Sequence, residues 1–191
     1  MTEIQRRILV PPLGYRAREA GLFAEQLDDQ SRRLAEATRG IEPAELAWQP
    51  APGLNTIGML LAHIAIVEVY WTQVGPLSLT TFETESVLGI GVDHDGMPLA
   101  AGGSPPAGLE GRELAYFDDL LARARAYLKR AVAELSDADL EREVPRKGRD
   151  GTLREILNLR WILYHMLEHE ACHYGQINLL AHHYRLAGGR G

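Results

Sequence analysis

The chain has 191 residues, 46% hydrophobic and 24% charged, which is a globular composition, and its single cysteine excludes an internal disulfide and any zinc site with several thiolates. Twenty Lys and Arg against 26 Asp and Glu give a formal net charge of −6, which disfavours binding of nucleic acid. No apolar run reaches 18 residues without a charge or a histidine, and the first residues do not resemble a signal peptide, so we expect a soluble cytoplasmic protein with no membrane partner.

Four long segments repeat their apolar residues with the period of a helix, and none shows the alternation typical of a strand. They cover about residues 15–38, 55–74, 111–135 and 152–186. The first is followed by Gly40 and a short helical turn, and Asn55 or Thr56 is placed to cap the second. The pattern predicts an all-α protein.

The fourth segment begins at Thr152, where the sequence TLRE through Glu155 has the form of a capping box. Apolar residues then occupy most of the circumference of the predicted helix, more than one bundle core can bury. We therefore expect a homodimer that buries part of this helix.

The connection over residues 76–110 is too long for a tight turn between antiparallel neighbours. Such a connection can cross the bundle, so that the second and third helices run parallel, or fold over one end as a lid. No internal repeat or low-complexity tract divides the chain, and we expect a single domain over residues 1–191.

Three histidines of the fourth segment, His165, His169 and His173, lie four residues apart. Adjacent pairs share a helix face and can bind one metal ion, but the outer pair is two turns, about 12 Å, apart. At most one pair can therefore serve one ion. Hydrogen bonding across the bundle is the alternative role for these polar groups.

His63 lies in the middle of the second segment on an otherwise apolar face. A single histidine in that setting is more often a core residue with a hydrogen-bond partner than a metal ligand. Together with a pair from the fourth helix, however, it would supply three nitrogen ligands. Three protein ligands with one position left open are typical of a catalytic zinc-type site.

Residues 48–63, WQPAPGLNTIGMLLAH, resemble the second-helix signature of the DinB/YfiT-like metalloenzyme superfamily. Residues 168–176, EHEACHYGQ, resemble its fourth-helix signature, in which a histidine is followed after three residues by His-x-Gly-Gln. The order of the two signatures and the long loop between them are also similar, so the resemblance covers nearly the whole chain.

This resemblance implies a four-helix bundle of up-down-down-up topology with a long crossover between helices 2 and 3, commonly dimeric. It also implies one divalent ion, such as zinc, nickel or iron, held by His63, His169 and His173, whereas His165 does not map to a ligand. Related branches are S-transferases that use mycothiol or bacillithiol, and a mycothiol-dependent maleylpyruvate isomerase. A low-molecular-weight thiol is therefore an expected co-substrate.

The sequence HEACH, residues 169–173, also satisfies the H-E-x-x-H pattern of zinc proteases. The extended form of that motif needs Gly and His where this chain has Gln176 and Leu179. The other form needs a downstream carboxylate, and no Asp or Glu follows His173. A protease is therefore disfavoured.

Four further polar residues belong to the same helices. The helical angles place Glu68 and Glu170 away from the histidines, and we expect both at the surface or at an interface. Cys172 is expected to be a small buried residue, and Gln176 to orient a ligating imidazole or a bound water.

Two loop motifs are weaker signals. The sequence DHDG over residues 93–96 suggests a cation loop but lacks the further ligands of a calcium site, and the basic turn at residues 146–149 could meet an anionic substrate.

The sequence leaves three functions open, and for the two enzymes among them the expected partner is a small-molecule substrate. The first is a thiol-dependent S-transferase acting on an electrophile, which only the family resemblance favours. The second is a hydrolase that activates water on the same metal, and the third is a metal-binding or stress-related protein without turnover. No catalytic residue other than the metal ligands is identified.

Overall fold

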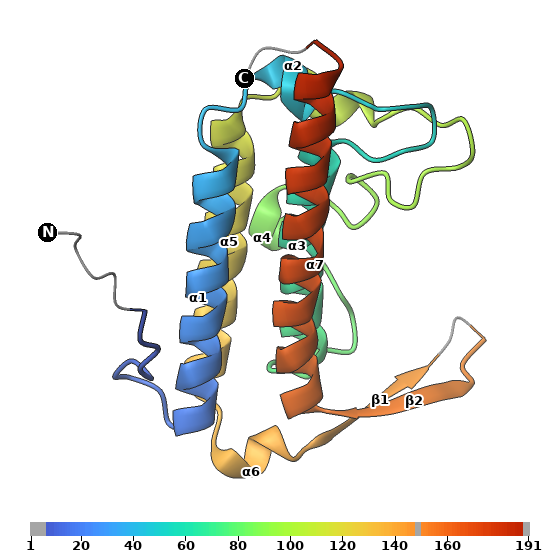
Figure 1. The fold of residues 1–191 in the computed structure, drawn as a ribbon. Helices are drawn as coiled ribbons and strands as arrows, with labels where there is room; N and C mark the ends of the chain where they lie inside the picture. The colour runs from blue at the N-terminus through green and yellow to red at the C-terminus, as the bar shows by residue number, and fades with distance from the viewer. Residues whose placement is uncertain (1–6, 148–149, 189–191) are drawn as a thin grey trace, which may run out of the picture.

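The computed structural model describes residues 7–147 and 150–188. Four long helices pack side by side: α1 (Arg18–Thr38), α3 (Ile57–Val74), α5 (Leu114–Ala133) and α7 (Leu159–Leu186) (Figure 1). Helices α1 and α7 run in one direction and α3 and α5 in the other, which is the expected up-down-down-up topology (Figure 1). Two predictions concern residues outside the described ranges. They are that residues 1–6 do not begin a signal peptide, and that Arg149 belongs to the basic turn.

The connection from α3 to α5 crosses the length of the bundle, which is why these two helices run parallel. It contains the short helix α4 (Glu85–Leu88) and the 3₁₀ turn η1 (Ala107–Leu109). Two further single-turn helices, α2 (Pro43–Leu46) and α6 (Asp137–Leu140), lie at opposite ends of the bundle (Figure 1). Thr56 caps α3 as predicted, and its hydroxyl accepts a hydrogen bond from the Met59 backbone N–H.

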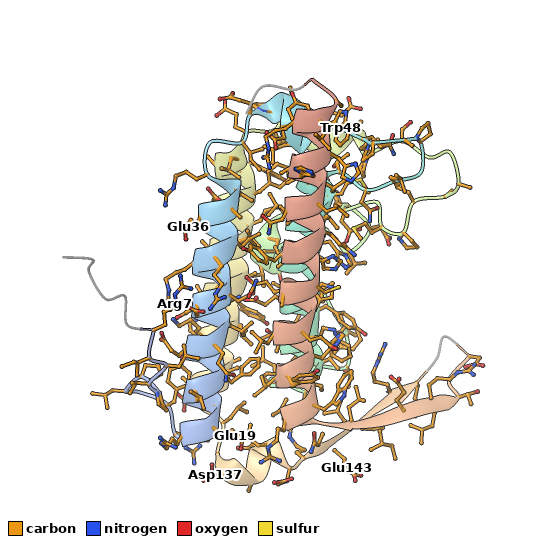
Figure 2. The ribbon with its side chains drawn as sticks, in the orientation of Figure 1. Arg7, Glu19, Glu36, Trp48, Asp137 and Glu143 are labelled. Carbon is orange, nitrogen blue, oxygen red and sulfur yellow. The ribbon has the colours of Figure 1, made fainter. Side chains whose placement is uncertain are left out.

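A β-hairpin replaces the predicted start of the last helix. Strand β1 (Glu143–Lys147) pairs antiparallel with β2 (Leu153–Asn158), and the hairpin projects from the end of the bundle where Glu19 and Asp137 lie (Figures 1 and 2). Thr152 is therefore not a helix cap, and the prediction of no strand is wrong. The first four residues of β2 are all exposed, so both faces of the strand meet solvent there. The sequence therefore shows no alternation of apolar and polar residues.

Helix α7 instead begins at Leu159, and the side chain of Asn158 caps it by accepting a hydrogen bond from the Trp161 backbone N–H at 2.8 Å. Leu153 and Ile156, which fall within the helix predicted over residues 152–186, are instead exposed on the hairpin. The apolar surplus of α7 is therefore smaller than the sequence suggested.

Helix α3 is long and apolar enough to span a membrane by length and composition alone. In the structure, 83% of its 18-residue window is buried inside the bundle, as in the core helix of a soluble protein.

A layer of charged side chains crosses the bundle between two apolar clusters. Arg125 of α5 binds Glu68 of α3 with two hydrogen bonds of 2.8 Å, and Glu170 of α7 with a third of 2.8 Å. Helix α1 contributes Asp28, whose carboxylate lies 3.5 Å from Arg125, and Ser31, whose hydroxyl donates to Glu170. Each of the four long helices thus contributes to this layer.

The predictions for Glu68 and Glu170 are wrong, since the two residues are only 6% and 2% exposed. Burial raises the pKa of Glu170, while the guanidinium of Arg125 opposes that shift. The helical angles correctly placed both side chains away from the histidines, but the bundle interior, with Arg125 as partner, lies on that side.

Replacement of this arginine, Arg125→Met, should destabilise the protein by about 3–5 kcal/mol, because two buried carboxylates lose their cation. The free energy of unfolding in urea at neutral pH measures this loss.

The exposed Arg130 on the same helix provides the matched control, since Arg130→Met should change stability little. Replacing Glu68 and Glu170 by leucine in the Arg125→Met background should restore much of the stability. Equal stability of Arg125→Met and Arg130→Met would contradict the assigned role.

Candidate metal centre

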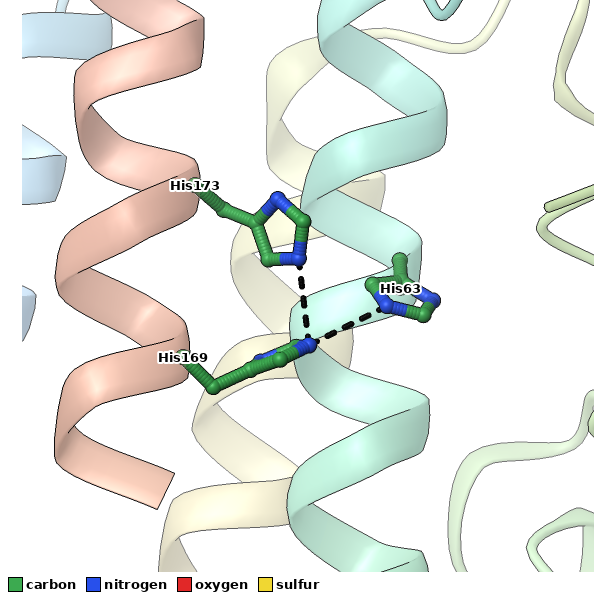
Figure 3. A group of neighbouring side chains, drawn as sticks. All are labelled: His63, His169 and His173. Carbon is green, nitrogen blue, oxygen red and sulfur yellow. Dashed lines mark hydrogen bonds between the residues drawn. The ribbon is translucent and has the colours of Figure 1, made fainter. Parts of the chain in front are cut away.

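Three imidazoles meet at the contact between α3 and α7. His63 projects from the middle of α3, and His169 and His173 project from adjacent turns of α7 toward it (Figure 3). The Nε2 atom of His169 lies 3.1 Å from the Nε2 atoms of both His63 and His173. One nitrogen of each residue lies within 4.8 Å of those of the other two.

The outer nitrogens of two rings have hydrogen-bond acceptors. His63 Nδ1 lies 2.7 Å from Asp95 Oδ2, and His173 Nδ1 lies 2.8 Å from Gln176 Oε1. Since a carboxylate and an amide oxygen can only accept, both Nδ1 atoms carry a proton and donate. In the neutral form of each ring, the lone pair then lies on Nε2, the atom that faces His169.

This donor set fits a divalent ion. Lone pairs that converge at 3.1 Å repel one another unless a cation or a proton lies between them. In a tetrahedral zinc site, with metal–nitrogen distances of about 2.0–2.1 Å, two ligand nitrogens lie about 3.3 Å apart. Two of the three nitrogen separations are thus already close to the value of such a site. That these three residues bind a metal ion stays a prediction.

The environment favours the neutral form of the two α7 rings, His169 and His173. Burial, together with the neighbouring His173, His63 and His165, lowers the pKa of His169 to about 3. Burial also lowers the pKa of His173, partly offset by its hydrogen bond to Gln176. Because only a neutral imidazole has a free lone pair, both rings are ready to bind a cation at neutral pH.

Asp95 is the residue at this site that the sequence did not identify. It belongs to the DHDG motif in the long α3–α5 connection, and it is only 2% exposed. While Oδ2 accepts from His63, Oδ1 accepts from the Met97 backbone N–H at 2.9 Å. The following Gly96 has a φ of +69°, and a Cβ there would lie 2.5 Å from the Pro106 side chain. The motif therefore supplies a carboxylate to His63 rather than a separate cation loop.

The other predicted residues take varied positions. Gln176 does orient an imidazole, as predicted, whereas Cys172 is exposed rather than buried. His165 lies outside the three-nitrogen cluster and stacks on Trp161, with the ring centroids 4.9 Å apart. Glu170, the general base in the protease interpretation, is instead held by Arg125 and Ser31. The structure thus gives that interpretation no base.

The family model described as the DinB superfamily matches residues 26–177. A crystal structure of the conserved protein of locus from Enterococcus faecalis is similar in fold, with a TM-score of 0.60 and 16% sequence identity over 84% of this chain and 93% of that one. No curated protein matches the chain.

The histidine ladder gives a prediction about which rings bind metal. Single substitutions His63→Ala, His169→Ala and His173→Ala should each abolish stoichiometric metal, because two nitrogens remain where three are needed. His165→Ala should stay loaded, since that ring is not part of the cluster.

Elemental analysis of the four variants, purified without a histidine tag, gives the metal-to-protein ratios, and circular dichroism checks folding. An empty His165→Ala together with a loaded His173→Ala would show that the wrong pair has been chosen.

The contact between Asp95 and His63 gives a second prediction. Asp95→Asn should weaken zinc binding about 10–100-fold, because the carboxylate that holds the ring in its orientation is lost. Titration against a competing chelator measures the affinity. The exposed neighbour Asp93 serves as the control, and equal affinities of Asp95→Asn and Asp93→Asn would refute the role of Asp95.

Proposed function

This chain belongs to the DinB superfamily, and we propose that it is a metal-dependent enzyme that transfers a small thiol to an electrophilic small molecule in the cytoplasm. The observation that carries the metal dependence is the convergence of three Nε2 atoms, two of them on rings whose other nitrogen is held by Asp95 or Gln176.

A divalent ion held by three imidazoles would lower the pKa of a bound thiol or water and hold the resulting anion. The protein side chains would fix the geometry. Asp95 and Gln176 hold two rings in the orientation that leaves Nε2 free, and the buried position of His169 keeps its ring unprotonated. The side chain of His63 is 21% exposed, which leaves the cluster a route to solvent.

The choice of thiol transfer rests on two supports. One is the resemblance of the two histidine signatures to a superfamily whose related branches include thiol-dependent enzymes. The other is that two carboxylates considered as a general base already have partners: Asp95 accepts from His63, and Glu170 binds Arg125. A thiolate needs no general base once formed, so a reaction with a thiol suits a site with these occupied groups.

The metal-loaded protein should consume a low-molecular-weight thiol when an electrophile that becomes fluorescent on thiol addition is present. We expect activity in wild type and its loss in His63→Ala, with His165→Ala retaining its metal. Assays with mycothiol, bacillithiol and glutathione would identify the thiol.

Ester or amide hydrolysis without thiol would replace this proposal by the hydrolase. Tight metal binding with no turnover across the panel would favour a metal-binding protein without catalysis.

We also propose a homodimer that uses α7. This helix exposes a set of large apolar side chains: Trp161, Tyr164, Leu179 and Leu186.

Light scattering at micromolar concentration should give about twice the chain mass of 21.2 kDa. Leu179→Glu should shift the mass toward the monomer, and a wild-type mass near 21.2 kDa would contradict the dimer.

A further inference from the structure

A cavity of about 510 Å³ lies beside the hairpin, between β1, the end of α3 and the segment that follows α3. Its lining combines cationic side chains with two aromatic rings: Arg142, Arg146 and Lys147 with Tyr70 and Phe82. The two rings contact each other edge to face, with centroids 5.1 Å apart. Cations beside aromatic rings are a suitable lining for an organic anion.

Positive charge exceeds negative charge in this lining. The guanidinium of Arg142 donates to Ser78 Oγ and to the Gly75 carbonyl, which are neutral acceptors. Arg146 reaches Glu155 across the hairpin at 3.2 Å, and more than a third of each side chain is exposed to solvent. Among the described residues that line the cavity, Glu143 is the one anion against three cations, and Glu155 and Asp139 act on Arg146 and Arg142 from outside the lining. This local excess stands out in a chain of net charge −6.

A row of aromatic rings connects Arg146 to the three-histidine cluster. The Arg146 guanidinium carbon lies 4.9 Å from the centroid of the Trp71 ring. The Trp71 centroid is 5.4 Å from that of His165, which in turn is 5.9 Å from that of His169. Three contacts, each under 6 Å, therefore lead from the cation to a predicted metal ligand.

The row also has an accessible edge. The Trp161 ring stacks on His165 with an interplanar angle of 9°, and Trp161 is 39% exposed. A flat apolar group could extend this stack without displacing the core. The residue that the sequence left without a role, His165, thus links the metal cluster to the hairpin.

We propose that the cavity and the aromatic row form a binding subsite for a small organic anion with an apolar or aromatic body. Its carboxylate or sulfonate binds Arg142 and Arg146, and its body lies along His165 and Trp161. Its other end approaches the His63, His169 and His173 cluster; this last part rests on the proposed function, whereas binding of the anion does not.

The test uses 4-phenylbutyrate as the probe and the neutral 4-phenyl-1-butanol as its uncharged match. Titration calorimetry on the wild-type protein should show the acid binding about 10–100-fold more tightly than the alcohol, because hydrogen bonds to the guanidinium are made to a charge. Equal affinities for acid and alcohol would overturn the proposal.

Arg146→Met removes the charge and keeps an apolar stem to cover Trp71. Its matched control is Arg154→Met, an exposed arginine of β2 that does not line the cavity. We expect Arg146→Met to lose at least tenfold in affinity for 4-phenylbutyrate and Arg154→Met to bind as wild type does. The same affinity in both variants would overturn the assignment.

Zinc loading separates this proposal from the proposed function. Arg146→Met should keep its full metal content, and metal-free His63→Ala should still bind 4-phenylbutyrate through the arginines. If wild type bound no metal but its probe binding depended on Arg146, the subsite would stand and the metal enzyme would fall. If neither folded His63→Ala nor metal-free wild type bound 4-phenylbutyrate, the probe would depend on the metal, and a subsite built on the arginines would be overturned.

Discussion

The alignment of the helices depends on one buried guanidinium. Arg125 contacts α3 and α7 through hydrogen bonds of 2.8 Å to Glu68 and Glu170. Sliding either helix by one turn, about 5.4 Å, would break these bonds and leave a carboxylate buried without its cation. Apolar packing tolerates such shifts far better, because one leucine contact resembles another. The charged layer therefore specifies the register that leucines alone would leave loose.

This register is set next to the predicted metal site. Glu170 follows His169 directly in α7, and Glu68 lies five residues after His63 in α3. When the two carboxylates bind the same arginine, the two histidines are brought to the same level on the adjoining face of the same helices. Bringing imidazole nitrogens to 3.1 Å requires this alignment, since an error of a few ångströms would separate them.

Two segments outside the bundle then complete the site. The α3–α5 connection brings Asp95 to His63, and the hairpin brings Arg146 to Trp71, so both additions pack against α3. The bundle supplies rigid ligand positions, whereas these segments supply the orienting carboxylate and the cationic lining. Differences in these two segments would change what the site binds without moving the histidines.

The sequence alone determined the four long helices, because apolar periodicity acts within a single helix. The parallel middle pair and the choice of His63, His169 and His173 followed from the resemblance of the two histidine signatures to a known family, since i, i+4 spacing left the pair on the last helix open. Only the tertiary structure decided where the last helix begins, since β2 has no alternating pattern and is held by pairing with β1. It likewise decided the partners of Glu68, Glu170 and Asp95. A helical angle shows which way a side chain points, but another part of the chain supplies the arginine or imidazole that makes its burial favourable.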